Sequence, residues 1–273
     1  MARVLDSVFV VLVVVVLVAA AIFLLVPILM TVLMSFDGRE YLGRFPPPVL
    51  SVRWYTAFFF DRDYMVALRN SAVIATVAAT MATVTGVAAA VLLDRYRFPG
   101  REALSTFFLS PLVVPTVVTG FSILMFLSLL GVSDGFVRLL AGHVIITLPY
   151  TIRTTLASLA GIKRSLVEAA LALGADEGRA FRDVTLPLAK TGVVAGAVLA
   201  FALSFEEVSV SLFLYDPPST TLPVAILGAM RSQFNLTLAS ASVVMMAVTA
   251  GLVLVLDRVF GLERIIGAGI YRS

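Results

Sequence analysis

The sequence predicts an all-α integral membrane protein, and its composition and the length of its apolar runs carry that prediction. Hydrophobic residues make up 60% of the 273 residues, charged residues only 14%, and the mean hydropathy is +1.04. Several apolar runs exceed the ~18 residues that mark a membrane-crossing helix. The runs lack the ten-residue alternation of a membrane β-barrel, so helices are favoured.

Six membrane-spanning helices can be drawn within a single domain that covers residues 1–273. The first apolar run is too long for the core of a signal peptide and is expected to stay uncleaved. The third span contains Pro111 and Pro115, which permit a bend, and the fourth contains Pro149 and Arg153. The predicted spans are 8–34, 70–93, 103–130, 142–161, 189–213 and 237–256.

The segments between the spans predict an orientation. Placing the N-terminus in the cytoplasm puts both lysines and most arginines on the inner side, so both termini are expected to be cytoplasmic. The outer loop 35–69 holds a proline run and aromatic residues at 54–60 that suit the membrane interface, and the outer segment 214–236 is a second structural lid. In such a protein the net charge of +3 sets topology or meets anionic lipid, rather than nucleic acid. The chain has no cysteine and one histidine, His143, so no metal site is predicted.

A charged segment, 162–190, lies between spans four and five on the predicted cytoplasmic side. Ser165 and Glu168 fit a capping box that opens a short helix. Gly174 is placed to end that helix in the left-handed conformation. This regularity indicates a folded helix–turn–helix rather than a plain loop.

The second half of the segment leads into span five. Asp176 and Glu177 favour the start of another helix, because acidic groups complement the helix dipole there. Leu186 precedes a proline, so extended backbone is expected at Leu186. Pro187 suits the first turn of span five.

The pattern of Glu168-Ala169-Ala170, Gly174, Val184 and Leu186-Pro187 resembles the EAA loop of type I ABC importer permeases. The resemblance implies that the segment is a coupling helix, which docks into a groove on a cytoplasmic ABC ATPase dimer and transmits its closure to the membrane spans. The residues that this implies for docking are Glu168, Ala169, Ala170 and Gly174, with Phe181, Leu186 and Pro187 shaping the base.

The resemblance covers almost the whole chain. Residues 94–100 are similar to the RYRFxG turn of that family, and residues 143–149, 203–208 and 221–223 are similar to its spermidine/putrescine branch. The resemblance implies a second, related permease subunit, an extracytoplasmic binding protein and a place in the bacterial inner membrane. Other branches carry opines, phosphonates, ferric iron or thiamine, so these substrates stay open.

The chain carries no signature of a nucleotide site or a catalytic centre. Lys163 follows an isoleucine and Lys190 an alanine, so neither is the lysine of a phosphate-binding loop. No zinc-protease motif and no nucleophile elbow is present. We therefore expect a transport subunit that is not an enzyme, with ATP and Mg bound by the partner ATPase.

Two acidic residues, Glu206 and Glu207, stand in the predicted fifth span. An ionised acid at the bilayer centre costs about 2.5–3.5 kcal/mol, so both are expected to face protein or water. Glu207 shares a helical stripe with Ser204 and Ser211 and is predicted to line the substrate pathway with them, whereas Glu206 is expected to pair with a neighbouring helix. The alternative places both acids at the outer boundary, where side chains snorkel.

Two other functions remain open at this point. A proton-coupled secondary transporter would use the two acids as a relay, and an intramembrane enzyme would need a catalytic group among the polar residues of the spans. Arg153 is either an anchor at the inner end of span four or the partner of an acid in the bundle. His143 is expected to form hydrogen bonds at the interface rather than to relay protons.

Overall fold

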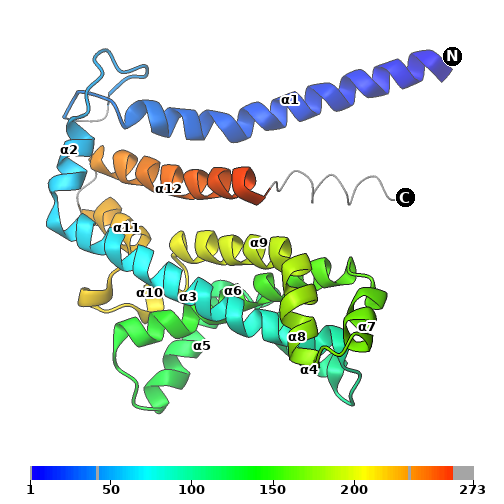
Figure 1. Cartoon of the computed structure of the whole chain (residues 1–273). Coiled ribbons are helices and arrows are strands. Elements are labelled where there is room, and N and C mark those ends of the chain that lie inside the picture. Colours follow the sequence, from blue (N-terminus) through cyan, green and yellow to red (C-terminus); the bar gives the residue numbers. More distant parts are fainter. Residues whose placement is uncertain (1, 41–42, 233–234, 261–273) are drawn as a thin grey trace. The chain divides into compact units, whose positions relative to one another are not determined.

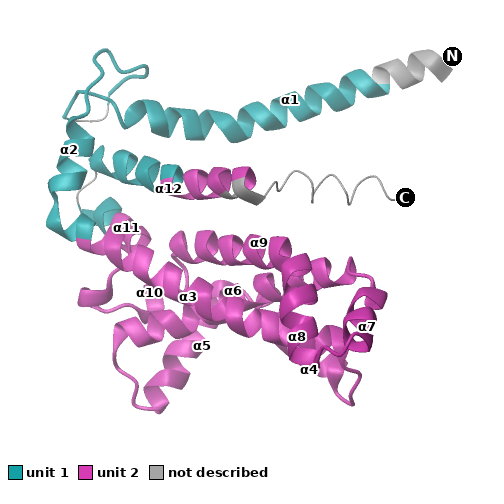
Figure 2. Ribbon diagram, in the orientation of Figure 1, with its two compact units in different colours: residues 1–65, 228–247 teal, residues 66–227, 248–273 magenta. Residues whose placement is uncertain are grey.

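The computed structural model describes residues 2–40, 43–232 and 235–260, and the named elements within these ranges are all helices (Figure 1). The chain forms two compact units, Met1–Met65 with Gly228–Ala247 and Val66–Leu227 with Val248–Ser273 (Figure 2). The predicted coupling segment, Glu206 and Glu207 belong to the second unit.

The first unit contains α1 (Ala2–Met34) and α2 (Arg53–Phe60), joined by a loop that a tryptophan holds in place. Trp54 Nε1 donates to the backbone oxygen of Asp37 at 2.7 Å, and Ser240 Oγ donates to the backbone oxygen of Trp54 at 3.0 Å. Arg39 donates to the carboxylate of Asp37, and this hydrogen bond lowers the pKa of Asp37. Only part of the predicted interfacial segment faces outward, since Trp54 is buried whereas Phe60 is 86% exposed.

The second unit holds most of the helices. α3 (Arg62–Arg95), which begins in the first unit, is followed by α4 (Arg101–Leu109), the short 3₁₀ turn η1 (Ser110–Leu112), α5 (Thr116–Leu129) and α6 (Gly135–Ala160). Next come α7 (Arg164–Ala172), α8 (Glu177–Ala180), the π-helical turn η2 (Phe181–Thr185) and α9 (Leu186–Phe205). The last elements are α10 (Ser211–Leu214), η3 (Pro217–Ser219), α11 (Leu222–Ser232) and α12 (Thr237–Phe260), of which the last two pass from one unit to the other.

Five described helices are long and apolar enough to cross a membrane, within residues 9–34, 62–95, 135–160, 177–205 and 237–255. The sequence places a third span at 103–130 with a bend at its prolines, and the bend is confirmed: residues 101–112 and 116–129 form two helices bent by 108°. The bend lies between Pro111 and Pro115, whose missing N–H groups free backbone carbonyls. A sixth span exists only if this bent pair counts as one.

The fourth and fifth spans also differ from their predicted bounds. α6 runs from Gly135 to Ala160 without a break at Pro149 or Arg153. The fifth span is predicted to continue to residue 213, but α9 ends at Phe205. Five residues without regular helix separate it from α10.

Small residues allow α6, α9 and α3 to approach closely. A Cβ atom added at Gly192 would lie 2.6 Å from the backbone oxygen of Thr154 on α6. A Cβ atom added at Gly86 on α3 would lie 2.9 Å from the Thr151 Cβ on α6. Thr151 Oγ1 donates to the backbone oxygen of Ala82 at 2.8 Å, which links α6 to α3. Such close packing through small residues is typical of helix association in membranes.

Candidate functional site

The first half of the predicted coupling segment is α7. The sequence predicts where α7 ends but not where it begins. The capping box is wrong: α7 begins at Arg164, its N-cap is Lys163, and no side chain caps it. The helix therefore starts one residue before Ser165, which places Ser165 inside the first turn. The stop at Gly174 is confirmed, with a φ of 90°.

The end of α7 is a Schellman motif. The N–H of Ala175 donates to the backbone oxygen of Ala170 at 3.1 Å, and the N–H of Gly174 donates to that of Leu171 at 3.0 Å. This pair of bonds needs the left-handed backbone that glycine adopts without steric penalty. Gly174 therefore fixes the angle at which α7 turns back towards α8.

The second half starts as predicted. Asp176 is the N-cap of α8, and its side chain accepts from the N–H of Arg179 at 2.8 Å. Pro187 lies in the first turn of α9, also as predicted. Extended backbone at Leu186 is wrong, because its φ and ψ of −64° and −43° are helical. A π turn precedes the proline and shifts the carbonyls with which its ring would clash, so the helix continues through Leu186.

Two residues at the C-terminal end of α3, Arg95 and Tyr96, hold this segment. Arg95 donates to Thr185 Oγ1, and its guanidinium lies over the ring of Phe181, 5.7 Å from the centroid. Tyr96 Oη donates to Glu177 Oε2 at 3.2 Å. We call these contacts the α3 clamp. They tie the end of a long apolar helix to the base of the predicted coupling segment.

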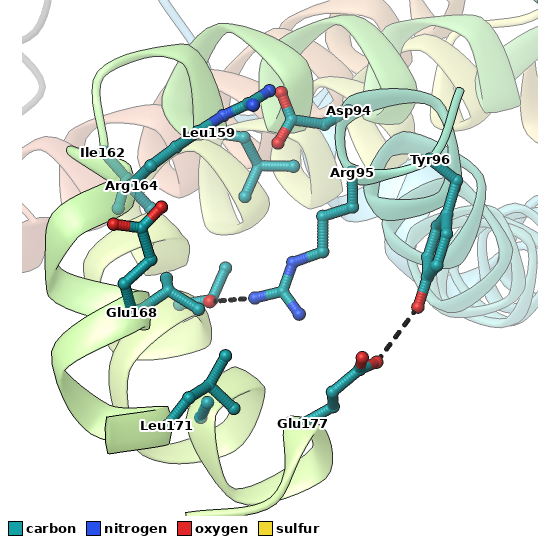
Figure 3. A pocket seen from close by; sticks show the side chains of 12 residues that line it. Asp94, Arg95, Tyr96, Leu159, Ile162, Arg164, Glu168, Leu171 and Glu177 are labelled. Atoms are coloured by element: carbon teal, nitrogen blue, oxygen red, sulfur yellow. Dashed lines mark hydrogen bonds between the residues drawn. The ribbon is translucent and has the colours of Figure 1, made fainter. Parts of the chain in front are cut away.

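A pocket of about 270 Å³ lies between the α3 clamp and α7 (Figure 3). Arg95 extends into it from α3, Glu168 and Leu171 approach it from α7, and Glu177 meets Tyr96 at its lower edge. The pocket is lined by both signs of charge: Asp94, Arg95, Arg164, Glu168 and Glu177.

The predicted docking residues occupy distinct positions around this pocket. Glu168 lines it, Ala169 and Gly174 are exposed, and Ala170 is half-buried. Phe181 and Leu186 are half-buried, and Pro187 is exposed. Leu166 and Leu173 are 47% and 89% exposed on the same segment and are not among the predicted docking residues. Their signal was visible as apolar residues in a short helix outside the spans.

A second polar cluster surrounds His143, deep inside the unit. His143 is buried, with Nδ1 2.6 Å from Ser204 Oγ and Nε2 2.9 Å from Ser211 Oγ. Ser211 Oγ donates its single proton to the backbone oxygen of Glu207 at 2.9 Å, so it accepts from the imidazole, and Nε2 carries the hydrogen. In the neutral ring Nδ1 then accepts from Ser204. The predicted hydrogen bonds of His143 are confirmed, but its place at the interface is wrong: the side chain is buried and joins α6 to both sides of the break after α9.

The break also changes the positions of the two acids. The shared stripe of Glu207, Ser204 and Ser211 is wrong, because α9 ends at Phe205 and both serines are buried against His143. Glu207 Oε1 accepts from the N–H of Val210 at 3.0 Å, as an N-cap does, and this favours a new turn over continuation of α9.

The remaining charged positions of the spans differ in their partners. Glu206 is exposed, and its Oε1 accepts from Thr249 Oγ1 on α12 at 2.8 Å, a pairing with a neighbouring helix of the kind predicted. Arg153 is exposed on α6 near its end at Ala160, and within residues 2–40, 43–232 and 235–260 no ion pair involves it. The sequence alternative of an acid partner for Arg153 therefore receives no support.

Comparison with known sequences identifies relatives over most of the chain. The sequence model of the family described as binding-protein-dependent transport system inner membrane component matches residues 82–262. The spermidine/putrescine transport system permease protein PotC of Escherichia coli (strain K12) is 34% identical over 204 residues, which cover 75% of this chain and 76% of PotC. The PotC protein of Haemophilus influenzae is 33% identical over 231 residues, which cover 85% of this chain and 89% of that protein.

Solved structures share the fold at low sequence identity. A chain of a bacterial ABC transporter involved in the import of the acidic polysaccharide alginate superposes with a TM-score of 0.70 and 16% identity, covering 89% of this chain and 91% of that chain. A chain of the MetNI methionine ABC transporter in an inward-facing conformation superposes with a TM-score of 0.61 and 19% identity. The match covers 74% of this chain and 99% of that chain. The chain therefore belongs to the family of binding-protein-dependent transport system inner membrane components, as a multi-pass permease subunit with the type I ABC importer fold.

Proposed function

We propose that this chain forms half of the translocation pathway of an ATP-driven importer for a polyamine such as spermidine or putrescine. A related second permease subunit supplies the other half, an extracytoplasmic binding protein delivers the solute, and a cytoplasmic ABC ATPase dimer binds ATP and Mg. Both termini lie in the cytoplasm, and the membrane is the bacterial inner membrane. The relatives named for spermidine and putrescine transport support the substrate class.

The observation that carries the coupling role is the α7–α8 segment itself. It presents Leu166 and Leu173 to the outside, beside charged groups, while the α3 clamp fixes its base. Exposed apolar side chains with a polar rim are typical of a surface that another protein covers. A groove on the ATPase would bury these leucines and receive Glu168 at their side.

The coupling role is tested with two glycines that differ in backbone conformation. Gly174→Ala forces an alanine into a φ of 90°, which costs about 1–2 kcal/mol and distorts the end of α7. Gly161→Ala is the matched control, since Gly161 has an ordinary φ of −79° and its added Cβ would lie 3.5 Å from the nearest heavy atom. In the reconstituted complex, Gly174→Ala should lower solute-stimulated ATP hydrolysis several-fold, and Gly161→Ala should not. Wild-type coupling in both variants would remove α7 from the mechanism.

The substrate class is tested by uptake into proteoliposomes that hold both permeases and the ATPase, with the binding protein and labelled spermidine outside. ATP-dependent uptake is expected, with Glu206→Gln and Glu207→Gln each raising the KM. An ion pair or charge-assisted hydrogen bond to an ammonium group is worth about 1.5–3 kcal/mol, which corresponds to a change of about tenfold or more. Uptake of an opine, a phosphonate, ferric iron or thiamine in place of spermidine would change the substrate assignment. Uptake driven by a proton gradient without the ATPase would instead indicate a secondary transporter.

A further inference from the structure

A groove of about 330 Å³ opens among α3, α9 and α12, and its lining includes neither His143 nor any residue of the predicted coupling segment. All of its lining residues belong to the second unit. Threonines from α3 form one wall, and small and aromatic residues of α9 face them. The lining residues are Thr76, Ala79, Thr80, Thr83, Val84, Ala197, Val198, Phe201 and Leu252.

The threonine hydroxyls of this groove are fixed as hydrogen-bond acceptors. Thr76 Oγ1 donates to the backbone oxygen of Ala72 at 2.7 Å, and Thr80 and Thr83 make the same bond to the residue four positions earlier, at 2.7 Å and 2.6 Å. A hydroxyl has one proton and two lone pairs. Because each proton is used within α3, the lone pairs are what these three side chains offer to a partner.

The three threonines form a line along the groove. They stand at i, i+4 and i+7, which places them on one face of α3 over about 10 Å. They lie near the middle of a 34-residue helix, so this row of acceptors is at the depth of the membrane rather than at its surface. An acceptor row of this length suits a solute with several donors along a chain.

The opposite wall and one end of the groove also favour positive charge. Phe201 lines the groove, and its ring is stacked on Phe205, with centroids 5.6 Å apart. An aromatic face attracts ammonium groups. Glu206 follows Phe205 in the chain, and its carboxylate accepts a hydrogen bond from Thr249 Oγ1. Thr249 lies one helical turn from Leu252, which lines the groove. The lining contains no lysine or arginine.

We propose that this groove is the wall of the translocation pathway that contacts the solute, and that its ligand is a linear polyammonium cation. Hydroxyl oxygens of Thr76, Thr80 and Thr83 accept from its ammonium groups in turn, Phe201 covers its methylene segments, and Glu206 is the carboxylate at the outer end. The inference rests on the proposed function, and it names groups that select the solute within the membrane.

The first experiment removes one acceptor without changing the shape of the side chain. Thr80→Val is compared with Thr85→Val in the full transporter with labelled spermidine. Thr85 is the matched control: it is also exposed on α3 and donates to the residue four positions earlier, at 2.7 Å, but it does not line the groove. Thr80→Val should raise the KM for spermidine about tenfold or more, which is the loss expected for one hydrogen bond to a charged group. Thr85→Val should leave the KM unchanged. Equal KM values in both variants would overturn the inference.

The second experiment uses the absence of cysteine from the chain. Thr80→Cys and Thr85→Cys are each assembled with cysteine-free partner subunits and treated with a charged, membrane-impermeant thiol reagent during turnover. Modification of Thr80→Cys that spermidine slows, without modification of Thr85→Cys, supports the inference. Protection of Thr80→Cys that spermidine does not change, together with cross-linking to the second permease, would show that a helix of that subunit fills the groove.

The two experiments separate this inference from the proposed function. If the wild-type transporter does not import spermidine, the proposed substrate class is wrong. If it imports spermidine while the threonine variants behave as the control does, only the groove assignment fails.

Discussion

Replacing Gly192 with alanine tests the packing of α9 on α6, which holds the coupling segment and the broken span in one unit. An added Cβ would lie 2.5 Å from the Ser158 Cβ and 2.6 Å from the backbone oxygen of Thr154. Real Cβ atoms do not approach other heavy atoms so closely, and a backbone oxygen cannot rotate away. The two helices must therefore separate to admit the methyl group.

The magnitude follows from two opposed terms. Alanine in place of glycine stabilises a helix by about 1 kcal/mol, whereas overpacking a close contact costs about 1–3 kcal/mol. Gly251→Ala is the matched control, because Gly251 lies inside α12 and an added Cβ meets no heavy atom within 4 Å. The helix term is common to both variants and cancels in their difference. Gly192→Ala is thus expected to be less stable than Gly251→Ala by about 1–3 kcal/mol.

The assay is reversible unfolding of the purified protein in mixed detergent–SDS micelles, followed by circular dichroism. The two free energies of unfolding are compared with each other rather than with the wild type, so the common helix term does not enter. If they agree within about 0.5 kcal/mol, which is the usual spread for substitutions that touch nothing, then α6 and α9 do not pack as closely as described.

Three further changes test other contacts. His143→Leu removes the hydrogen-bond partner of the buried Ser204 hydroxyl, whereas Ser211 keeps its bond to the backbone oxygen of Glu207. The free energy of unfolding should therefore fall by about 1–3 kcal/mol, and a change below 1 kcal/mol would refute the bridge. Arg95→Leu removes the Arg95 contacts of the α3 clamp and leaves the Tyr96–Glu177 bond in place. It should uncouple ATP hydrolysis from transport while the complex still assembles, as followed by co-purification; unchanged transport per ATP would contradict a role of the clamp in coupling. Hydrogen bonds from the Ser219 side chain and from the Gly135 and Ser219 backbone lower the pKa of Asp216 below its usual value. The stability that this carboxylate adds is present above its unfolded pKa of about 4, and it is lost as the pH falls through the lower folded pKa. The stability difference between wild type and Asp216→Asn should therefore shrink on acidification below pH ~4. A difference that stays constant to pH ~3 would show that Asp216 contributes nothing by ionisation.

Local features of the candidate site could be predicted from the sequence. The left-handed stop at Gly174, the cap at Asp176 and the place of Pro187 in the first turn of α9 are confirmed. Each depends on the backbone preference or the side-chain reach of one residue within a few positions. The predicted start of α7 at the Ser165 capping box was wrong. A capping-box pattern does not exclude an earlier start, and the helix begins after Lys163 without a side-chain cap.

The roles of the other site residues depend on partners far away in the chain. His143 bonds to Ser204 and Ser211, 61 and 68 positions later, and Arg95 bonds to Thr185, 90 positions later. Nothing in the neighbouring sequence of these residues identifies such partners. A polar residue in a span predicts only that it avoids lipid, not which group it meets.

The sequence by itself determined that this protein lies in the membrane, is built of helices and carries a folded segment between its fourth and fifth spans. Hydropathy, run length and turn chemistry are local quantities, and the bilayer forces every backbone polar group of a span to be satisfied within its own helix. Only the tertiary structure decided where α9 ends, because the energy that ends it comes from contacts across the unit. The buried His143, with a serine on either side of the break, stabilises an unwound backbone that the apolar sequence alone would continue as helix.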